Sequence, residues 1–157
     1  MSLLDLFQWC EDSRVGDAIR TSLWLFPGIE SIHLLGLVVI AAAVLVVDMR
    51  LFGVGFQEHP VAELARDVQP WLVGSLGVML VTGFLLFLSE SIKCYYSVAF
   101  WVKMTSLALA IIFTFTVRRR VVFSDEEVGP VRSKVVAVMS VALWAGVGWG
   151  GRWIGFS

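Results

Sequence analysis

The sequence is poor in charge, has few cysteines and lacks the short motifs of familiar enzymes. Only 16% of its 157 residues are charged while 58% are hydrophobic, and the mean hydropathy is +0.83, which excludes an ordinary soluble domain. The formal net charge of -1 leaves no basic surplus, so nucleic acid is excluded as a partner. No C-x-x-C, H-E-x-x-H, P-loop or G-x-S-x-G motif occurs, and we therefore expect no enzyme activity from the chain on its own.

The long hydrophobic runs predict membrane-spanning helices. Crossing about 30 Å of hydrocarbon takes roughly 20 helical residues, and each span must be helical because a backbone in lipid has to satisfy its own hydrogen bonds. The windows that are long and apolar enough cover approximately residues 23–47, 70–88, 100–117 and 135–154. We therefore predict a single all-α domain over residues 1–157, an integral membrane four-helix bundle.

Two segments outside these windows predict shorter helices. Residues 2–20 mix leucine, phenylalanine and tryptophan with charges, which is typical of an interfacial amphipathic helix. Residues 58–69 predict a second short helix, with Pro60 in its first turn and Pro70 opening the next span. The first residues lack the basic and apolar regions of a secretory signal, so we expect the first hydrophobic run to remain in the mature protein.

The placement of arginine and lysine predicts the orientation. Seven of the twelve basic residues fall in the first and third links between spans, namely Arg50, Arg66, Arg118, Arg119, Arg120, Arg132 and Lys134. The positive-inside rule places those links in the cytoplasm. Both termini then lie outside, which in a bacterial inner membrane is the periplasm.

Each predicted span brings a titratable or charged side chain to the outer half of the bundle. These are Glu30 and His33 in the first span, Glu90, Lys103 and Arg152 in the following ones. Charges at membrane depth cost roughly 2.5 to 3.5 kcal/mol each, so they usually face the bundle interior, pair with one another and mark a functional site. We expect Glu30 or Glu90 to pair with Lys103 and Arg152, which leaves His33 as the deepest polar group.

His33 has two interpretations of similar weight. In the structural one, its ring is hydrogen-bonded to a hydroxyl on a neighbouring helix, such as Thr82 or Ser140. In the functional one, its imidazole ligates haem b or a metal ion such as copper. His59 is the only other histidine and falls in a loop, so a bis-histidine site within one chain is disfavoured. A single-histidine site or one shared across a homodimer stays open.

Methionine could supply a softer second ligand to such a metal. Met79, Met104 and Met139 fall within the predicted spans, although methionine in an apolar helix is more often ordinary core.

Other residues point to packing. Asp48, at the inner end of the first span, is interpreted as a helix-terminus charge that pairs outward with a residue such as Arg118. Gly146 and Gly150 are four residues apart, a spacing that lets helices approach closely, either within the bundle or against a second subunit. The glycines around Arg152 could instead leave space for a flat ligand.

The two cysteines predict a disulfide. Cys10 lies in the amphipathic segment and Cys94 in the outer loop, so both fall on the oxidising side in the predicted orientation. A bridge between them would tie the amphipathic helix over the polar cluster.

Several stretches together resemble a known family. The stretches are "WLFPGIESIHLLGL", "VVDMRLFG", "TGFLLF", "AFWVKM" and "WAGVGWGGRWIGF", in order from Trp24 to Phe156. They resemble an uncharacterised family of bacterial inner-membrane proteins with four spans, which is distantly similar to the membrane proteins of bacterial copper resistance. Residues at the family's polar positions here are Glu30, His33, Asp48, Arg50, Lys103 and Arg152. The resemblance implies the fold and these residues but no activity.

Three functions are compatible with this sequence. The first is a redox or cofactor-binding membrane subunit, with His33 on haem b or a metal and with Lys103 and Arg152 neutralising propionates or an anionic partner. The second is a cation or proton transport or copper-handling component in which Glu30, His33 and Glu90 line a vestibule. The third is a structural subunit of a larger complex. Homo-oligomers, or other membrane or periplasmic subunits, are the expected protein partners.

Overall fold

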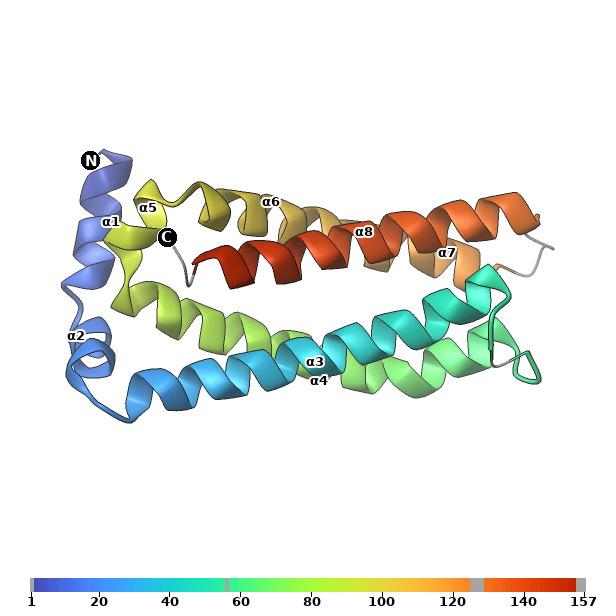
Figure 1. Ribbon diagram of the computed structural model, residues 1–157, viewed down its shortest axis with the longest axis horizontal. Coiled ribbons are helices and arrows are strands. Elements are labelled where there is room, and N and C mark those ends of the chain that lie inside the picture. The colour runs from blue at the N-terminus through green and yellow to red at the C-terminus, as the bar shows by residue number, and fades with distance from the viewer. Residues whose placement is uncertain (1, 56, 125–128, 155–157) are drawn as a thin grey trace.

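The computed structural model describes residues 2–55, 57–124 and 129–154, and these are almost entirely helical (Figure 1). The helices are α1 (Leu3–Glu11), α2 (Arg14–Thr21), α3 (Leu25–Phe52), α4 (Val61–Ser89), α5 (Ser91–Tyr96), α6 (Val98–Phe113), a π-helical turn (Thr114–Arg118), α7 (Arg119–Val122) and α8 (Pro130–Ile154). Four segments are long and apolar enough to cross a membrane: α3, α4, Val98–Val122 and α8. The chain is therefore an all-α, multi-pass membrane protein, as predicted.

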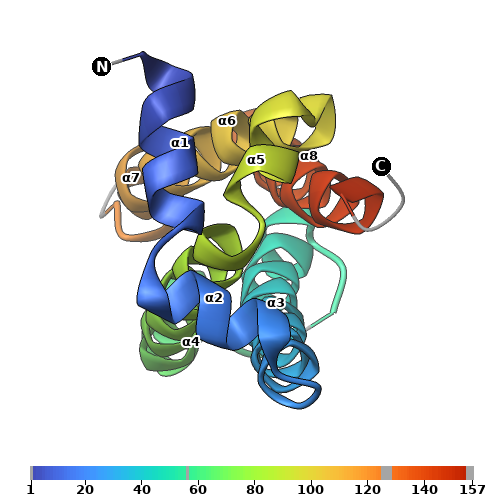
Figure 2. The same cartoon turned by 90° about the vertical axis from the view of Figure 1, so that its left-hand side faces the viewer.

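The four long helices form a bundle, with α3 packed on α4, α6 packed on α8, and α3 also packed on α8. Helices α1, α2 and α5 lie across one end of the bundle (Figure 2). We call that end the α1 end and the opposite end the α7 end. The C-terminal turns of α8 lie at the α1 end (Figure 1).

The middle of the bundle is an apolar core. Ile40, Val44, Leu76, Ala110 and Val147 are each exposed by 8% or less and belong to one packed cluster. Because lipid tails are as apolar as leucine, this packing stabilises the bundle through close van der Waals contact rather than through removal of apolar surface from water.

Helix α4 differs from its prediction. The short helix expected over residues 58–69 and the span expected to begin at Pro70 form one continuous helix, Val61–Ser89, with Pro70 inside it. Proline removes one helical hydrogen bond and usually ends or kinks a helix. Here Ala65 and Leu72, on either side of it, are buried in the two core clusters, so packing keeps the helix continuous.

The third span contains a wide turn that the sequence did not predict. Over Thr114–Arg118 the backbone is π-helical, and the N–H of Arg119 donates to the carbonyl of Thr114. The side chain of Thr114 accepts a hydrogen bond of 3.2 Å from the indole Nε1 of Trp144 on α8. Such turns occur often at functional positions.

The predicted interfacial helix is two helices. Helix α1 begins with a capping box in which Ser2 and Asp5 exchange hydrogen bonds, at 2.7 and 3.2 Å, and these bonds hold the pKa of Asp5 below its usual value. Glu11, the last residue of α1, accepts a hydrogen bond of 2.6 Å from the N–H of Ile92 on α5. A Cβ at Gly16 of α2 would overlap the carbonyl oxygen of Leu88, so α2 lies directly on the end of α4.

Aromatic side chains close the α1 end. Phe7 of α1 is buried and makes edge contacts with Phe87 at 5.1 Å, Tyr95 at 5.3 Å and Phe100 at 6.5 Å between ring centroids. Such contacts stabilise by about 0.5 to 1.5 kcal/mol each beyond burial. The amphipathic segment is therefore anchored to α4, α5 and α6.

Candidate functional site

His33 is buried between α3 and α4, and its hydrogen bonds determine its tautomer. The hydroxyl of Thr82 donates to the carbonyl of Val78 at 2.7 Å. Its oxygen is therefore the acceptor for the Nδ1 of His33, 3.0 Å away. In the neutral ring the proton then sits on Nδ1, and the lone pair on Nε2 stays available.

Lys103 lies against that lone pair. Its Nζ is 3.5 Å from the Nε2 of His33, so α6 donates to the histidine of α3. A Cβ at Gly150 of α8 would lie 3.0 to 3.2 Å from the Cβ, Cα and N of Lys103, and one at Gly151 would lie 3.7 Å from its Cε and Nζ. A Cβ at Gly83 would lie 3.1 Å from the Cε1 of His33. The missing side chains of these glycines thus make room for Lys103 and the imidazole.

Among the described residues, the predicted pairing of Glu30 or Glu90 with Lys103 is absent. Glu90 lies 3.8 Å from Lys93 on α5, so the expected pairing of Glu90 with Lys103 is wrong. In the part of the chain that the structure describes, no ion pair joins Glu30 to a cation. Arg152 is exposed on the last turn of α8.

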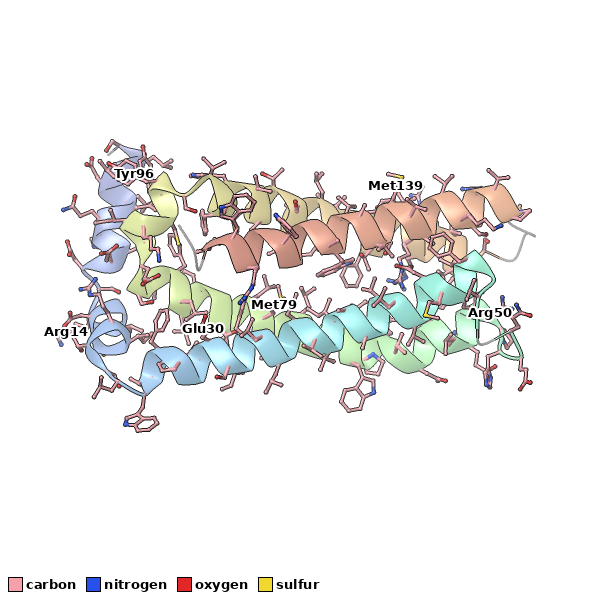
Figure 3. The ribbon with its side chains drawn as sticks, in the orientation of Figure 1. Arg14, Glu30, Arg50, Met79, Tyr96 and Met139 are labelled. Carbon is pink, nitrogen blue, oxygen red and sulfur yellow. The ribbon has the colours of Figure 1, made fainter. Side chains whose placement is uncertain are left out.

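Glu30 lies beside the buried histidine but is itself exposed. It lies one helical turn from His33, yet it is exposed whereas His33 is only 8% exposed. Figure 3 shows its side chain on the side of α3 that faces α8. The exposed carboxylate and the buried imidazole thus lie one turn apart on α3 near the α1 end. We call His33, Thr82 and Lys103, together with the exposed Glu30, the α1-end site.

The methionines proposed as second ligands lie in different places. Met79 is 3% exposed, and its Cβ is 3.8 Å from the position a Cβ would take at Gly36, one turn from His33. Met104 and Met139 are 43% and 47% exposed, on the outside of the bundle. Within the described residues no three side chains of His, Cys, Asp or Glu come together as metal ligands.

The glycines of α8 pack within the bundle. A Cβ at Gly146 would lie 3.0 Å from the Oγ of Ser106, and Gly150 packs on Lys103, so both face α6. Of the two interpretations of their spacing, contact inside the bundle is confirmed. The space near Gly150 and Gly151 is filled by Lys103 rather than left for a flat ligand.

Cys10 lies half-buried on α1, and Cys94 lies buried on α5. Their helices, α1 and α5, pack against each other, and the predicted bridge between the two cysteines stays a prediction. Burial, together with the nearby carboxylate of Glu90, raises the pKa of the Cys94 thiol to about 11.

A second polar group lies near the α7 end. The Oδ1 of Asp48 accepts a hydrogen bond of 2.9 Å from the Nε of Arg118, and the Nη2 of Arg118 donates to the carbonyl of Val44 at 3.1 Å. The pairing of Asp48 with Arg118 is confirmed, but its direction was wrong: the two side chains are 1% and 7% exposed, inside the bundle. Arg118 is the last residue of the π-helical turn, and no sequence pattern predicted that turn.

Apolar packing separates this pair from the α1-end site. Asp48 lies about 22 Å beyond His33 along α3, at about 1.5 Å per residue. The core residues Ile40 and Val44 lie between them on the same helix and are 0% and 1% exposed. The two polar groups are thus separate sites.

Comparison with known proteins identifies a family but no activity. A family model described as "Family of unknown function (DUF6644)" matches residues 6–157. No curated protein and no solved structure matches the chain.

Proposed function

Because the chain belongs to the DUF6644 family, whose function is unknown, we propose a function from the geometry of the α1-end site: a membrane-embedded, cofactor-binding subunit of a redox system. In this proposal Lys103 binds an anionic group of the cofactor beside His33. The observation that carries it is the ammonium of Lys103. Among the described residues its one hydrogen-bonding neighbour is the Nε2 of His33, 3.5 Å away.

A positive charge on Lys103 in this position would lack a counter-charge. A charge at membrane depth costs roughly 2.5 to 3.5 kcal/mol, and a neutral imidazole does not neutralise it. In the described part of the chain no carboxylate forms an ion pair with Lys103. A carboxylate or phosphate of a bound molecule would supply the missing charge and a charge-assisted hydrogen bond. This supports ligand binding over a role in holding the helices together.

Haem b is the cofactor whose chemistry fits this pair of residues. It carries both an iron that takes an imidazole nitrogen and carboxylates that take a cation, and it supplies one-electron transfer when bound. The hydrogen bond from Nδ1 to Thr82 leaves Nε2 of His33 to face the iron, as metal-ligating histidines are usually held. Lys103 would hold a carboxylate of the haem, and to do so its side chain would turn away from Nε2 and leave the space that it fills beside Gly151.

The test is the composition of the protein purified from membranes in mild detergent. An absorption spectrum with elemental analysis should show a Soret band or a stoichiometric metal in the wild type, lost in His33→Gln and reduced in Lys103→Met. Lys93→Met is the matched control, because it removes a lysine that is paired with Glu90 at the same end of the bundle. If the wild type contained no chromophore and no metal, haem and metal would be removed from the proposal.

A stability measurement distinguishes ligand binding from a purely structural role. If Lys103 only holds helices together, Lys103→Met lowers the thermal midpoint of the ligand-free protein. If the charge of Lys103 is compensated only when a ligand is bound, removing that charge leaves the thermal midpoint of the ligand-free protein unchanged or raises it. The proposal predicts the second result.

Cation or proton handling, including copper handling, is the second candidate. The observation in its favour is the contact of the Lys103 Nζ with the His33 Nε2, two nitrogens that can exchange a proton. The apolar core between this site and Asp48 supports binding over passage across the bundle. Uptake of a metal or proton that is unchanged in His33→Gln would remove this candidate.

The proposed location is the bacterial inner membrane, with both termini in the periplasm and further subunits or a second copy as partners. Its support is the gathering of basic residues at the α7 end, among them Arg119 and Arg120. A single cysteine placed in turn at Ser2 and at Ser124, in a chain whose Cys10 and Cys94 are replaced by serine, should react with a membrane-impermeant maleimide in intact spheroplasts only at Ser2. Labelling at Ser124 alone would reverse the orientation.

A further inference from the structure

A basic hollow lies at the α7 end, far from the α1-end site. It has a volume of about 370 Å³ and is lined by Phe115, Thr116, Arg119, Arg120 and Phe123. Arg119 and Arg120 are exposed, and within the described residues neither forms an ion pair. Two guanidinium groups and two aromatic rings thus line one open face at the end of the third span.

Three other arginines near the α7 end already have partners. Arg118 is held by Asp48 inside the bundle, and the Nε of Arg50 donates to the carbonyl of His59 at 2.9 Å. The guanidinium of Arg66 lies over the ring of Phe123, 5.7 Å from its centroid, and so adds a third positive charge beside the hollow.

The hollow continues into an apolar crevice. Phe115, Arg119 and Phe123 also line a cavity of about 40 Å³ whose opposite wall is α4, with Val68 and Leu72. Ile112, one turn back along α6 from Phe115 and Thr116, is 59% exposed. A molecule held by the arginines would therefore meet apolar side chains in the direction of the membrane interior.

We propose that this hollow binds an anionic phospholipid, with the phosphate on Arg119 and Arg120 and the acyl chains along α6 toward the membrane interior. Planar guanidinium groups bind phosphate through paired N–H donors, and basic residues clustered at the end of a membrane helix attract anionic headgroups. The hydroxyl of Thr116 donates to the carbonyl of Ile112 at 2.5 Å, so its oxygen can accept from a headgroup hydroxyl. The aromatic walls and the exposed apolar surface match the glycerol and acyl parts of a lipid, which a soluble phosphate lacks.

The experiment is a lipid titration of the purified full chain in mild detergent, followed by native mass spectrometry. Phosphatidylglycerol should bind with defined stoichiometry, and phosphatidylcholine with the same acyl chains should bind about tenfold or more weakly. Glycerol 3-phosphate at the same concentration should not compete. Competition by glycerol 3-phosphate, or equal binding of the two lipids, would overturn the proposal.

Variants locate the site. Arg119→Gln combined with Arg120→Gln should weaken phosphatidylglycerol binding about tenfold or more, because each basic residue near an anionic headgroup contributes measurably. Arg132→Gln combined with Lys134→Gln is the matched control, since it removes the same charge from the beginning of α8. An equal loss of phosphatidylglycerol affinity in both double glutamine variants would show a general effect of surface charge, and the proposed site would be wrong. Arg119→Lys combined with Arg120→Lys keeps the charge but not the forked donors. The affinity of this variant for phosphatidylglycerol should lie between that of the wild type and that of the double glutamine variant.

Discussion

The close contact of Gly150 with Lys103 gives a prediction whose size follows from the structure. A Cβ at Gly150 would lie 3.0 Å from the Cβ of Lys103 and 3.2 Å from its Cα and N. Two of these atoms are backbone and cannot rotate away, so α6 and α8 must separate by a few tenths of an ångström. Gly148, two residues earlier on the same helix, has no neighbour within 4 Å of its Cβ position. It is therefore a matched control.

Both alanine substitutions gain the same helix propensity, about 1 kcal/mol relative to glycine. Their difference therefore isolates the packing strain, which for overpacked sites is about 1 to 3 kcal/mol. Gly148→Ala should be neutral or stabilising, and Gly150→Ala should be less stable than Gly148→Ala by that amount.

The assay is thermal unfolding of both variants in the same detergent, followed by circular dichroism. For a chain of this length, about 1 kcal/mol corresponds to roughly 2 to 4 °C in the midpoint. The Gly150→Ala midpoint should fall below that of Gly148→Ala by at least this much. Equal midpoints would refute the close approach of α6 and α8 at Lys103, and with it the position assigned to the ammonium.

Three further predictions follow from the structure. Asp48→Asn and Arg118→Met should each destabilise the bundle by about 3 to 5 kcal/mol, because each leaves a buried partner uncompensated. In thermal unfolding, the double variant should lose less stability than the sum of the two single variants. Additive losses would contradict the pairing. Because burial raises the pKa of the Cys94 thiol to about 11, its reaction with maleimide in a chain without Cys10 should be slow at neutral pH and rise steadily up to about that value; a rate that levels off below pH 9 would contradict this. Gly16→Ala should loosen α2 from the end of α4 and speed proteolysis of the N-terminal segment, while Gly28→Ala, with open space at its Cβ position, should not; equal proteolysis of both variants would argue against that contact.

The architecture was predictable because membrane helices are determined by local composition. The apolar runs of about 20 residues identified all four spans, although α3, α4 and α8 extend beyond the predicted limits. Pro70 was interpreted as a helix start because propensity rules weigh a proline without the contacts of its neighbours. The burial of Leu72 and Ala65, which lets α4 continue through Pro70, depends on other helices.

The sequence predicted which polar residues lie toward the same end of the bundle, but not the direction in which each side chain points. Residue spacing places His33 and Lys103 in the same half of the bundle, and the Thr82 hydroxyl was among the expected partners of His33. Whether Lys103 faces a carboxylate or an imidazole depends on which helices are neighbours and how each is rotated. The π-helical turn at Thr114–Arg118, which precedes the contact of Arg118 with Asp48, also follows from tertiary packing and has no signature in a single sequence.

The most direct measurement for the proposed function is the native mass spectrum of the wild-type chain, released from membranes in mild detergent, beside those of Lys103→Met and Lys93→Met. The proposal predicts one added ligand mass, distinct from that of a phospholipid, on the wild type and on Lys93→Met, and a reduced occupancy of it on Lys103→Met. A wild type without such a ligand, or the same occupancy of it on all three chains, would contradict binding of an anionic group at Lys103.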